Sequence, residues 1–345
     1  MRKLTILSVA FPFALVGPDP VGGAEQILSS IDHALTRAGH RSIVIAAEGS
    51  QTSGDLIAVP RPAQPISTQD WHHAHDFLRM MIRRIVDDAG ADLVHLHGVD
   101  FQNYLPPPGV PVLATLHLPL SSYSPSVLNP ERPRTWLNTV SHHQHQALGA
   151  HSRVISMIEN GIDAPPLPAG PKGSFALALG RICPEKGFHL ALAAATAADI
   201  ALLLAGTTSG FPEHLAYFER EITPRLDAQR RWIGPVSGFR KWQLLQSARC
   251  VLVPSLIPET ASLVAREALA AGTPVIAFPN GALAETIEHG RTGFLVDDVA
   301  AMTEALGRVD ALDPAECRCI AQQRYSGARM TDRYLELYQQ LVEAG

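Results

Sequence analysis

Short apolar runs alternate with amphipathic stretches along most of the chain. A strand inside a parallel sheet is buried on both faces and reads as a continuous apolar run, whereas a covering helix repeats its apolar positions every three to four residues. Helices are expected between the runs, for example over 71–89. Strands are predicted at 3–10, 42–47, 93–97, 112–116, 136–140, 154–157, 175–179, 200–205, 231–233, 250–254 and 273–278. This α/β alternation predicts open parallel sheets covered by helices on both faces.

A proline-rich segment interrupts the alternation. Residues 164–173 contain Pro165, Pro166, Pro168 and Pro171 and almost no charge, which is typical of a linker. We therefore expect two doubly wound, Rossmann-like domains, over 1–164 and 174–323, joined by a linker over 165–173.

The stretch from Cys250 to Asp298 carries the richest chemistry. A strand at 250–254 precedes Glu259, a helix from about Ser262 that ends at Gly272, and another strand. Parallel strand–helix–strand units place ligands beyond the carboxyl ends of their strands. Glu259 falls at that edge, and Glu267 falls in the second turn of the helix.

The start of this helix favours an anion, because the first backbone N–H groups lack intrahelical acceptors and the helix dipole is positive there. Glu259 and Glu267 can accept hydrogen bonds from hydroxyl groups on either side of such an anion, an order of groups that a nucleotide sugar has. Ser262 is expected to be the N-cap. The alternative is a loop glutamate and a solvated helix glutamate. The donor-binding residues expected here are Glu259, Thr260, Ala261, Ser262, Leu263, Val264 and Glu267.

A second cationic motif, Gly180-Arg181 followed by Glu185-Lys186-Gly187, lies between a predicted strand and a predicted helix. Arg181 offers a planar fork to phosphate, and Lys186 offers a mobile point charge. The alternative is a solvated turn with a salt bridge to Glu185.

Together these motifs resemble the retaining glycosyltransferases of family 4, which have the GT-B fold. The resemblance rests on the Gly-Arg…Glu-Lys-Gly motif, the two glutamates, the run Glu-Ala-Leu-Ala-Ala-Gly-Thr-Pro-Val-Ile-Ala at 267–277, Gly281-Ala282 with Glu285, and His-Gly-Arg-Thr-Gly-Phe-Leu-Val at 289–296. The chain departs from the family at Ala261-Ser262, where such proteins usually carry Phe-Gly. The loss of the aromatic side chain affects how the donor sugar would fit in the site.

The resemblance implies two domains facing a cleft, with a last helix over 324–345 that crosses back to the first domain. It implies transfer of a hexose from a nucleoside-diphosphate sugar to the hydroxyl of a glycan, lipid or small molecule, with retained configuration. Arg181 and Lys186 would bind the diphosphate, Glu259 the sugar and Glu267 the ribose.

Five further residues are assigned to the donor through the same resemblance. Gly22 and Gly23 match a Gly-Gly-x-Glu loop, and glycines there let the backbone approach a ligand at a helix N-terminus. Pro235 and Val236 match a loop that contacts the nucleobase, and His117 matches a histidine that touches the donor sugar. His95 and His97 could line the acceptor side.

Neither a metal ion at the diphosphate nor a cofactor is expected. The sequence has no Asp-x-Asp motif, so the cations of Arg181 and Lys186 are expected to stabilise the diphosphate instead. The clusters His72-His73-x-His75 and His142-His143-x-His145 keep a metal-dependent hydrolase as an alternative, although solvated helix faces are favoured. A nucleotide-sugar-binding protein that has lost catalysis is the other alternative, because of Ala261-Ser262.

Bulk properties narrow the partners. The chain has 345 residues and a formal net charge of −5, which argues against nucleic-acid binding. The four cysteines form no disulfide framework. No secretory signal and no apolar run of about 20 residues stand out, so a cytoplasmic protein is expected. The segment 77–86, which carries Arg79, Arg83 and Arg84, could dock on an anionic membrane, but a covering helix with a basic outer face is favoured.

Overall fold

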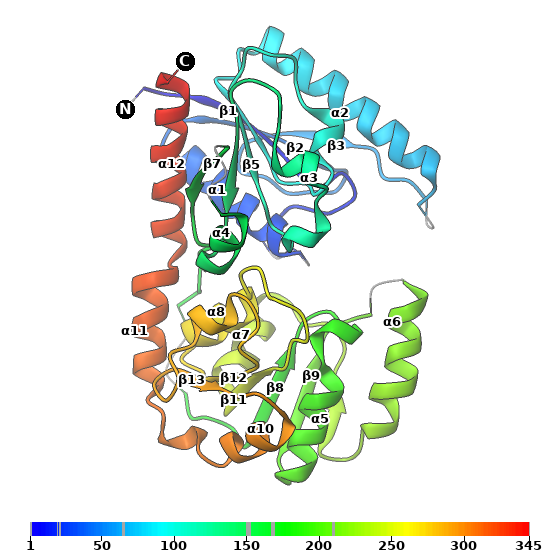
Figure 1. Cartoon of the computed structure of the whole chain (residues 1–345), viewed down its shortest axis with the longest axis vertical. Coiled ribbons are helices and arrows are strands. Elements are labelled where there is room, and N and C mark those ends of the chain that lie inside the picture. The colour runs from blue at the N-terminus through cyan, green and yellow to red at the C-terminus, as the bar shows by residue number, and fades with distance from the viewer. Residues whose placement is uncertain are drawn as a thin grey trace. The chain divides into compact units, whose positions relative to one another are not determined.

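The chain divides into two compact units (Figure 1). Unit 1 comprises Met1–Gly161 and Gly327–Gly345, and unit 2 comprises Ile162–Ser326. The computed structural model describes residues 2–18, 20, 22–63, 66–149, 153–166, 170–208 and 211–344. The proline-rich segment predicted as a linker therefore lies partly outside the described residues.

Within the described residues, unit 1 contains a seven-stranded parallel sheet with the order β3-β2-β1-β4-β5-β6-β7. Its register places Val9 of β1 beside Ile45 of β2 and Leu96 of β4. The strands are β1 (Thr5–Val9), β2 (Arg41–Ala47), β3 (Asp55–Val59), β4 (Leu93–Leu96), β5 (Val112–Thr115), β6 (Thr135–Thr139) and β7 (Val154–Met157).

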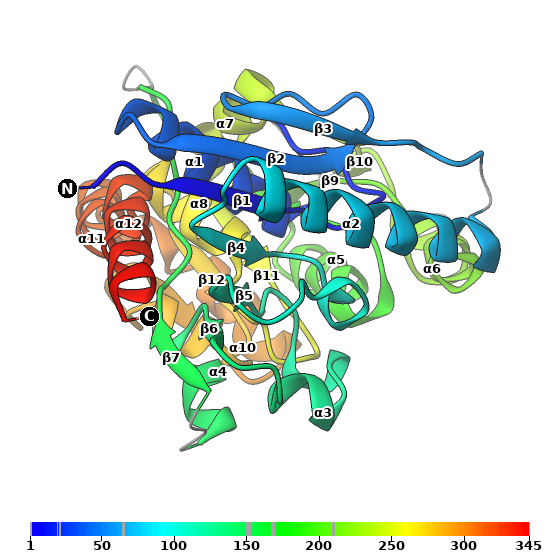
Figure 2. The same cartoon turned by 90° about the horizontal axis from the view of Figure 1, so that it is seen from above.

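The hydrophobic pattern missed β3. This strand lies at the edge of the sheet, and most of its residues are at least partly exposed. An edge strand needs no continuous apolar run, because it is not buried on both faces. Figure 2 shows β1, β2 and β3 side by side, with α2 running along the sheet.

Two long helices and the last helix cover this sheet. α2 begins with a capping box, in which the Ser67 side chain accepts a hydrogen bond from the Asp70 amide and Asp70 reaches back to the Ser67 amide. The last helix packs beside α1 and buries Tyr334, Leu337 and Tyr338. The helices of unit 1 are α1 (Gly23–Arg37), α2 (Thr68–Asp88), η1 (Phe101–Tyr104), η2 (Leu120–Ser122), α3 (Pro125–Leu128), α4 (His142–Leu148) and α12 (Gly327–Glu343).

The helix expected over 324–345 is divided. Arg324 belongs to α11, which ends at Tyr325, and α12 begins at Gly327. Ser326 between them has extended backbone angles, φ −68° and ψ 141°, so the helix cannot continue through it.

Unit 2 repeats the architecture with a six-stranded parallel sheet in its described residues, in the order β10-β9-β8-β11-β12-β13. The strands are β8 (Phe175–Leu179), β9 (Ala201–Ala205), β10 (Arg230–Trp232), β11 (Cys250–Val253), β12 (Val275–Ala277) and β13 (Gly293–Leu295). The helices are η3 (Pro184–Lys186), α5 (Phe188–Ala197), α6 (Pro212–Tyr217), η4 (Phe218–Ile222), η5 (Thr223–Arg225), α7 (Gly238–Ser247), α8 (Leu263–Ala270), α9 (Leu283–Thr286), α10 (Val299–Leu306), η6 (Val309–Ala311) and α11 (Pro314–Tyr325).

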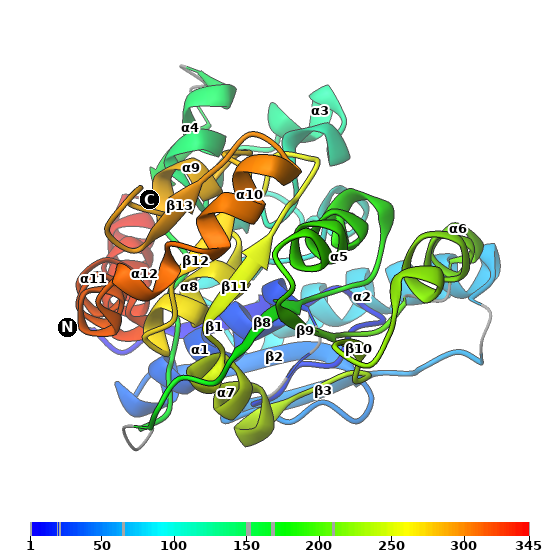
Figure 3. The ribbon, with the colours of Figure 1, turned by 90° about the horizontal axis from the view of Figure 1, so that it is seen from below.

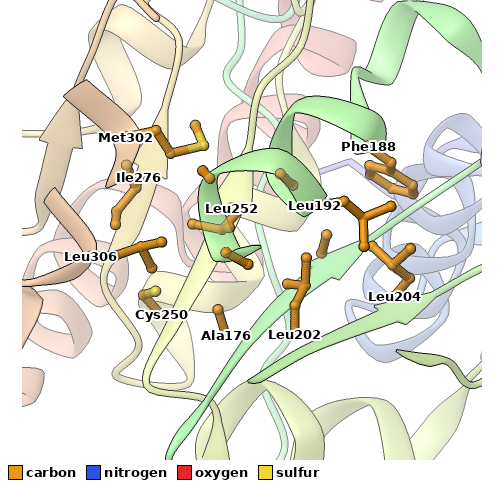
Figure 4. Packing of buried hydrophobic residues seen from close by; sticks show 14 of the residues in the cluster. Ala176, Phe188, Leu192, Leu202, Leu204, Cys250, Leu252, Ile276, Met302 and Leu306 are labelled. Atoms are coloured by element: carbon orange, nitrogen blue, oxygen red, sulfur yellow. The ribbon is translucent and has the colours of Figure 1, made fainter. Parts of the chain in front are cut away.

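Strand β11 is apolar throughout because its two faces are buried in different hydrophobic cores. Cys250 and Leu252 face a core that α5 and α10 complete, whereas Val251 and Val253 face a second core completed by α7, α8 and α11. Figure 3 shows these two groups of helices around β8 and β11. In Figure 4, Leu252 and Ile276 lie in one cluster with Leu192. Each such side chain contributes about 1.5–3 kcal/mol on burial.

The fold therefore confirms the predicted α/β class, with two doubly wound parallel sheets. No helix in the part of the chain that the structure describes has both the length and the apolar character needed to cross a bilayer.

Candidate active site

The carboxyl ends of β8 and β11 carry the two predicted motifs, and the backbone ties them together. The Leu256 N–H donates to the Glu185 carbonyl over 2.8 Å. Gly187 has φ +65°, and a Cβ at this position would lie 2.2 Å from the Pro254 carbonyl oxygen. Only glycine fits such a close approach without displacing the backbone, so Gly187 allows η3 to pack against the end of β11.

Lys186 and Glu259 meet at this edge. Lys186 Nζ lies 2.6 Å from Glu259 Oε1, and the two side chains are 26% and 10% exposed. The Ser255 hydroxyl donates to the same carboxylate oxygen. A charge-assisted pair in a partly desolvated position is stronger than a surface pair. Two residues that are 73 positions apart in the sequence are thus held in one polar cluster.

The backbone of Glu259 is held by the following loop. The Ala282 N–H donates to the Glu259 carbonyl over 2.8 Å, and the Glu259 N–H donates to Asn280. Gly281 has φ +64°, and a Cβ there would lie 2.4 Å from the Glu259 carbonyl oxygen. The Gly281-Ala282 pair of the family motif therefore positions Glu259.

Arg181 is the exposed cation of this edge. It follows Gly180, which has φ +145°. The guanidinium forms no hydrogen bond or ion pair with the described residues, although it lies close enough to the Glu185 carboxylate to help lower the pKa of that group. It is therefore available to an external anion.

Helix α8 begins at Leu263, so Ser262 occupies the N-cap position as predicted, but it does not cap the helix with its side chain. Ser262 has φ +42° and ψ +69°, and its side chain makes no capping hydrogen bond. N-cap residues usually have extended backbone angles that direct the side chain at the first amides. The left-handed backbone conformation of Ser262 is one that glycine adopts without strain. Thr260, Ala261, Leu263 and Val264 complete this turn, in which Ala261 is buried.

Glu267 is buried, so the solvated-residue alternative is wrong for it. Its side chain is 4% exposed, and Oε1 lies 2.9 Å from Nζ of Lys241 on α7. The neighbouring Arg266 is also buried, and its guanidinium lies over the Tyr325 ring, 4.3 Å from the ring centroid. Lys241 is a site residue that sequence reasoning missed, because a single lysine in a helix has no distinctive spacing.

The loop after β10 carries Pro235 and Val236. Gly234 has φ +74°, and its carbonyl accepts a hydrogen bond from the Gly206 N–H over 2.9 Å. Pro235 is exposed, and Val236 packs against the α7–α8 side of the core. This loop therefore lies beside the loop after β9, at the same edge of the sheet as Lys186.

Gly22, Gly23 and His117 belong to unit 1, so the structure does not group them with the residues above. Gly22 precedes α1 and Gly23 is its first residue. A Cβ at Gly22 would lie 1.8 Å from Glu25 Oε2. The group that closely approaches Gly22 is thus the Glu25 carboxyl of the same chain. Burial raises the pKa of this carboxyl.

His117 is part of a cluster with His95 and His97. His117 Nε2 lies 3.0 Å from His97 Nδ1, and burial lowers the pKa of His117 to about 3. The pKa values of His95 and His97 are also lowered well below the usual range by burial. All three rings are therefore neutral near pH 7.

His95 cannot line an acceptor site. It is fully buried, and both ring nitrogens are occupied, by the Thr115 hydroxyl at 2.7 Å and the Tyr338 hydroxyl at 2.6 Å. By contrast, His97 Nε2 and His117 Nδ1 are buried and have no hydrogen-bond partner among the described residues. The expectation for His95 is wrong because α12 covers it.

The two histidine clusters do not form metal sites in the described residues, because neither brings three ligand atoms together. His72, His73, His142 and His143 are exposed. His75 instead pairs with Asp100 at 2.8 Å. A cavity of about 590 Å³ in unit 1 is lined by Trp71, His72, His75, Asp76, Arg79 and Asn103.

Comparison with solved structures defines the class of protein. A structure of AviGT4, a glycosyltransferase involved in avilamycin A biosynthesis, has a TM-score of 0.75 and 25% sequence identity, with 99% of each chain covered. Alr3699/HepE of Anabaena has a TM-score of 0.74 and 19% identity over 98% of this chain and 100% of that chain. The fold is that of the GT-B glycosyltransferases.

Sequence comparison then defines the family. The profile "Glycosyltransferase Family 4" matches residues 21–164, and "Glycosyl transferases group 1" matches residues 163–319. A phosphatidyl-myo-inositol mannosyltransferase of Mycobacterium leprae is 27% identical over 377 aligned positions, which cover 95% of each chain. A D-inositol 3-phosphate glycosyltransferase of Corynebacterium urealyticum is 33% identical over 179 positions, 47% of this chain and 42% of that protein. The chain belongs to the family 4 glycosyltransferases, as its motifs indicated.

Proposed function

We propose that this glycosyltransferase moves a hexose from a nucleoside-diphosphate sugar to an acceptor hydroxyl, with retained configuration and without a metal ion at the diphosphate. The observation that carries the proposal is the Lys186–Glu259 pair, 2.6 Å apart, in the same loop region as the exposed Arg181. Breaking the bond to the sugar builds negative charge on the departing diphosphate, and fixed cations stabilise that charge as it forms.

Each residue of this edge receives one role. Arg181 and Lys186 bind the leaving diphosphate, and the first amides of α8 bind its oxygens, since an N-terminus carries roughly half a positive charge. Glu259 orients both the sugar and the Lys186 ammonium group. Glu267, held by Lys241, accepts hydrogen bonds from the ribose hydroxyls.

The unit 1 residues are assigned to the other reacting groups. His117 donates or accepts a hydrogen bond with the donor sugar as a neutral ring, which its lowered pKa favours. Gly22 and Gly23 let the start of α1 approach the donor. The open nitrogen of His97, in place of His95, is assigned to the acceptor.

Structures of relatives support the choice of donor. Alr3699/HepE has been solved in complex with UDP and glucose and in complex with UDP-glucose. Its sequence identity to this chain is 19% and 18% in these two structures, so the likeness supports the donor class by analogy of fold. The names of two relatives refer to phosphatidyl-myo-inositol and D-inositol 3-phosphate, so inositol and its phosphates are the first acceptors to test. A cytoplasmic location stays a prediction.

The test is a donor screen followed by a turnover assay. Thermal shifts with UDP, GDP, ADP and their hexose derivatives identify the nucleotide, because a ligand that binds the native state raises the melting temperature. The stabilising donor is then incubated with an acceptor panel, with and without a chelator, and the anomeric configuration of the product is read by NMR. We expect turnover that the chelator leaves unchanged and a product with the donor's configuration.

Each arm of this assay can reject one part of the proposal. Binding of a donor with no turnover on any acceptor would favour the binding-protein alternative. A rate abolished by the chelator and restored by a divalent ion would overturn the metal-free diphosphate site, and an inverted product would overturn retention.

A further inference from the structure

Three potential metal ligands converge beside the η3 turn of unit 2. Cys183 precedes η3, Glu185 lies within it, and His214 lies on α6. One ligand atom of each lies within 4.8 Å of the ligand atoms of the other two. None of the three belongs to the donor-binding set proposed above.

The fold creates this convergence. β8 and β9 are adjacent parallel strands, so the loops that follow them share one edge of the sheet. The Ile182 N–H donates to the Thr207 carbonyl over 3.0 Å, which joins the two loops just before Cys183. The thiol and carboxylate of the η3 turn and the imidazole of α6 are therefore presented to one point.

We propose that Cys183, Glu185 and His214 bind one transition-metal ion of the zinc type. Thiolate, imidazole and carboxylate form the ligand set that zinc prefers, and three protein ligands leave a fourth position for water. Metal–ligand bonds of about 2.0–2.3 Å place tetrahedral donor atoms roughly 3–4 Å apart. The ligand atoms lie within 4.8 Å of one another, so they would have to approach by up to about 1–2 Å to reach that geometry.

Burial and charge support a metal ion rather than a solvated turn. Cys183 is fully buried and His214 is 7% exposed, so two of the ligands are held inside the protein. The Cys183 thiol and the Glu185 carboxylate share a hydrogen bond, and His214 lies near the same carboxylate. A thiolate and a carboxylate together carry two negative charges, which a divalent ion neutralises. The positive charges of Arg181 and Lys186 lie on the same turn and oppose binding.

The metal would connect η3 to α6. Because Lys186 is the last residue of η3, the ion would fix the turn that carries this lysine without contacting the diphosphate. A ligand that binds only the folded state also raises the melting temperature. We expect metal to stabilise the protein while the chemistry proceeds without it.

The experiment is a cobalt(II) titration of reduced, full-length protein without a histidine tag. Cobalt bound to a thiolate gives a charge-transfer absorption that histidine and carboxylate ligands alone do not produce. We expect this band to saturate at one cobalt per chain, to disappear on addition of zinc, and to accompany a higher melting temperature.

Matched variants show which residues bind the cobalt ion that produces the absorption band. Cys183→Ser is expected to abolish it and weaken binding more than roughly 100-fold, because changes outside the ligand shell alone cost 10–100-fold. His214→Gln keeps the thiol but is expected to weaken binding strongly. Cys319→Ser removes the exposed cysteine and should change nothing.

The folding of each metal-free variant is checked by circular dichroism and thermal melting. His214→Gln serves as the decisive variant if Cys183→Ser does not fold. A titration without a thiolate band would overturn the proposal, as would a band that survives both ligand substitutions or that Cys319→Ser removes.

Discussion

The polar sites of the two units differ in charge. In unit 2, Lys186 pairs with Glu259 and Lys241 pairs with Glu267, so its functional groups are charged and mutually compensated. In unit 1, His97 and His117 are neutral rings, each with one unpartnered nitrogen among the described atoms. Unit 2 therefore offers charged groups to a ligand, whereas the histidines of unit 1 offer neutral hydrogen bonds.

The largest expected effect is a loss of kcat that distinguishes the charged site of unit 2 from the neutral site of unit 1. Lys186→Ala should lower kcat roughly 100- to 1,000-fold at saturating donor, because one fixed donor to a developing anion has that value. His117→Gln should lower it only about 10-fold, since a neutral hydrogen bond contributes about 0.5–1.5 kcal/mol. Initial rates with the donor found in the thermal-shift screen provide the measurement.

The control for this comparison is Lys3→Ala, which removes an exposed lysine of unit 1 and should keep the wild-type rate. Equal losses for Lys186→Ala and His117→Gln would remove the distinction between a charged and a neutral site. A wild-type rate for Lys186→Ala would reject its assignment to the diphosphate.

The second effect concerns the buried pair that sequence reasoning missed. Lys241→Gln leaves the Glu267 carboxylate buried without its ammonium partner, and we expect a loss of about 1–3 kcal/mol in the free energy of unfolding. Chemical denaturation measures this loss. The double variant Lys241→Gln/Glu267→Gln should recover part of it, because no uncompensated charge remains. Additive losses in the double variant would contradict an interaction between the two residues.

The third effect is a pH dependence that belongs to unit 1. The folded-state pKa values of His95, His97 and His117 lie below the ordinary value of 6.5, so the unfolded chain binds more protons as the pH falls below 6.5. The stability is therefore complete above about pH 6.5 and is lost progressively on acidification, towards about pH 3 for His117. Each histidine contributes up to about 1.4 kcal/mol per pH unit.

Denaturant unfolding between pH 7 and pH 5.5 measures this slope, and His117→Gln should reduce it. The control His73→Gln changes an exposed histidine and should leave the slope unchanged. Glu25 acts in the opposite sense, because burial raises the pKa of its carboxyl group, but it is present in the wild type and in both variants and therefore cancels in the comparison. An unchanged slope in His117→Gln would contradict a neutral, buried ring.

The smallest effect tests the strained start of α8. Ser262 has φ +42°, and a left-handed conformation costs a non-glycine residue about 1–2 kcal/mol. Part of this is offset by the greater flexibility of glycine in the unfolded chain, so Ser262→Gly should stabilise the protein by about 0.5–1 kcal/mol. Ala270→Gly in the same helix should destabilise it by about 1 kcal/mol. Melting curves that shift in the same direction for both variants would contradict the strain.

The fold class and the motifs of unit 2 could be predicted from the order of amino acids alone. Strands such as β11 are buried on both faces, and this burial appears directly as a continuous apolar run. Glu259 and Glu267 were identified by their spacing around the start of one helix. These features could be predicted because a strand and the helix that follows it each impose a characteristic spacing of apolar residues on the sequence.

Which side chains meet could not be predicted and became visible in the folded chain. Lys241 reaches Glu267 across 26 residues, and Tyr338 covers His95 across 243 residues. The ligand atoms of Cys183, Glu185 and His214 converge from the η3 turn and helix α6. Edge strand β3 and the conformation of Ser262 also escaped prediction. Contacts between distant segments leave no period in the sequence, since they depend on the order of strands in the sheet and on the path of each loop.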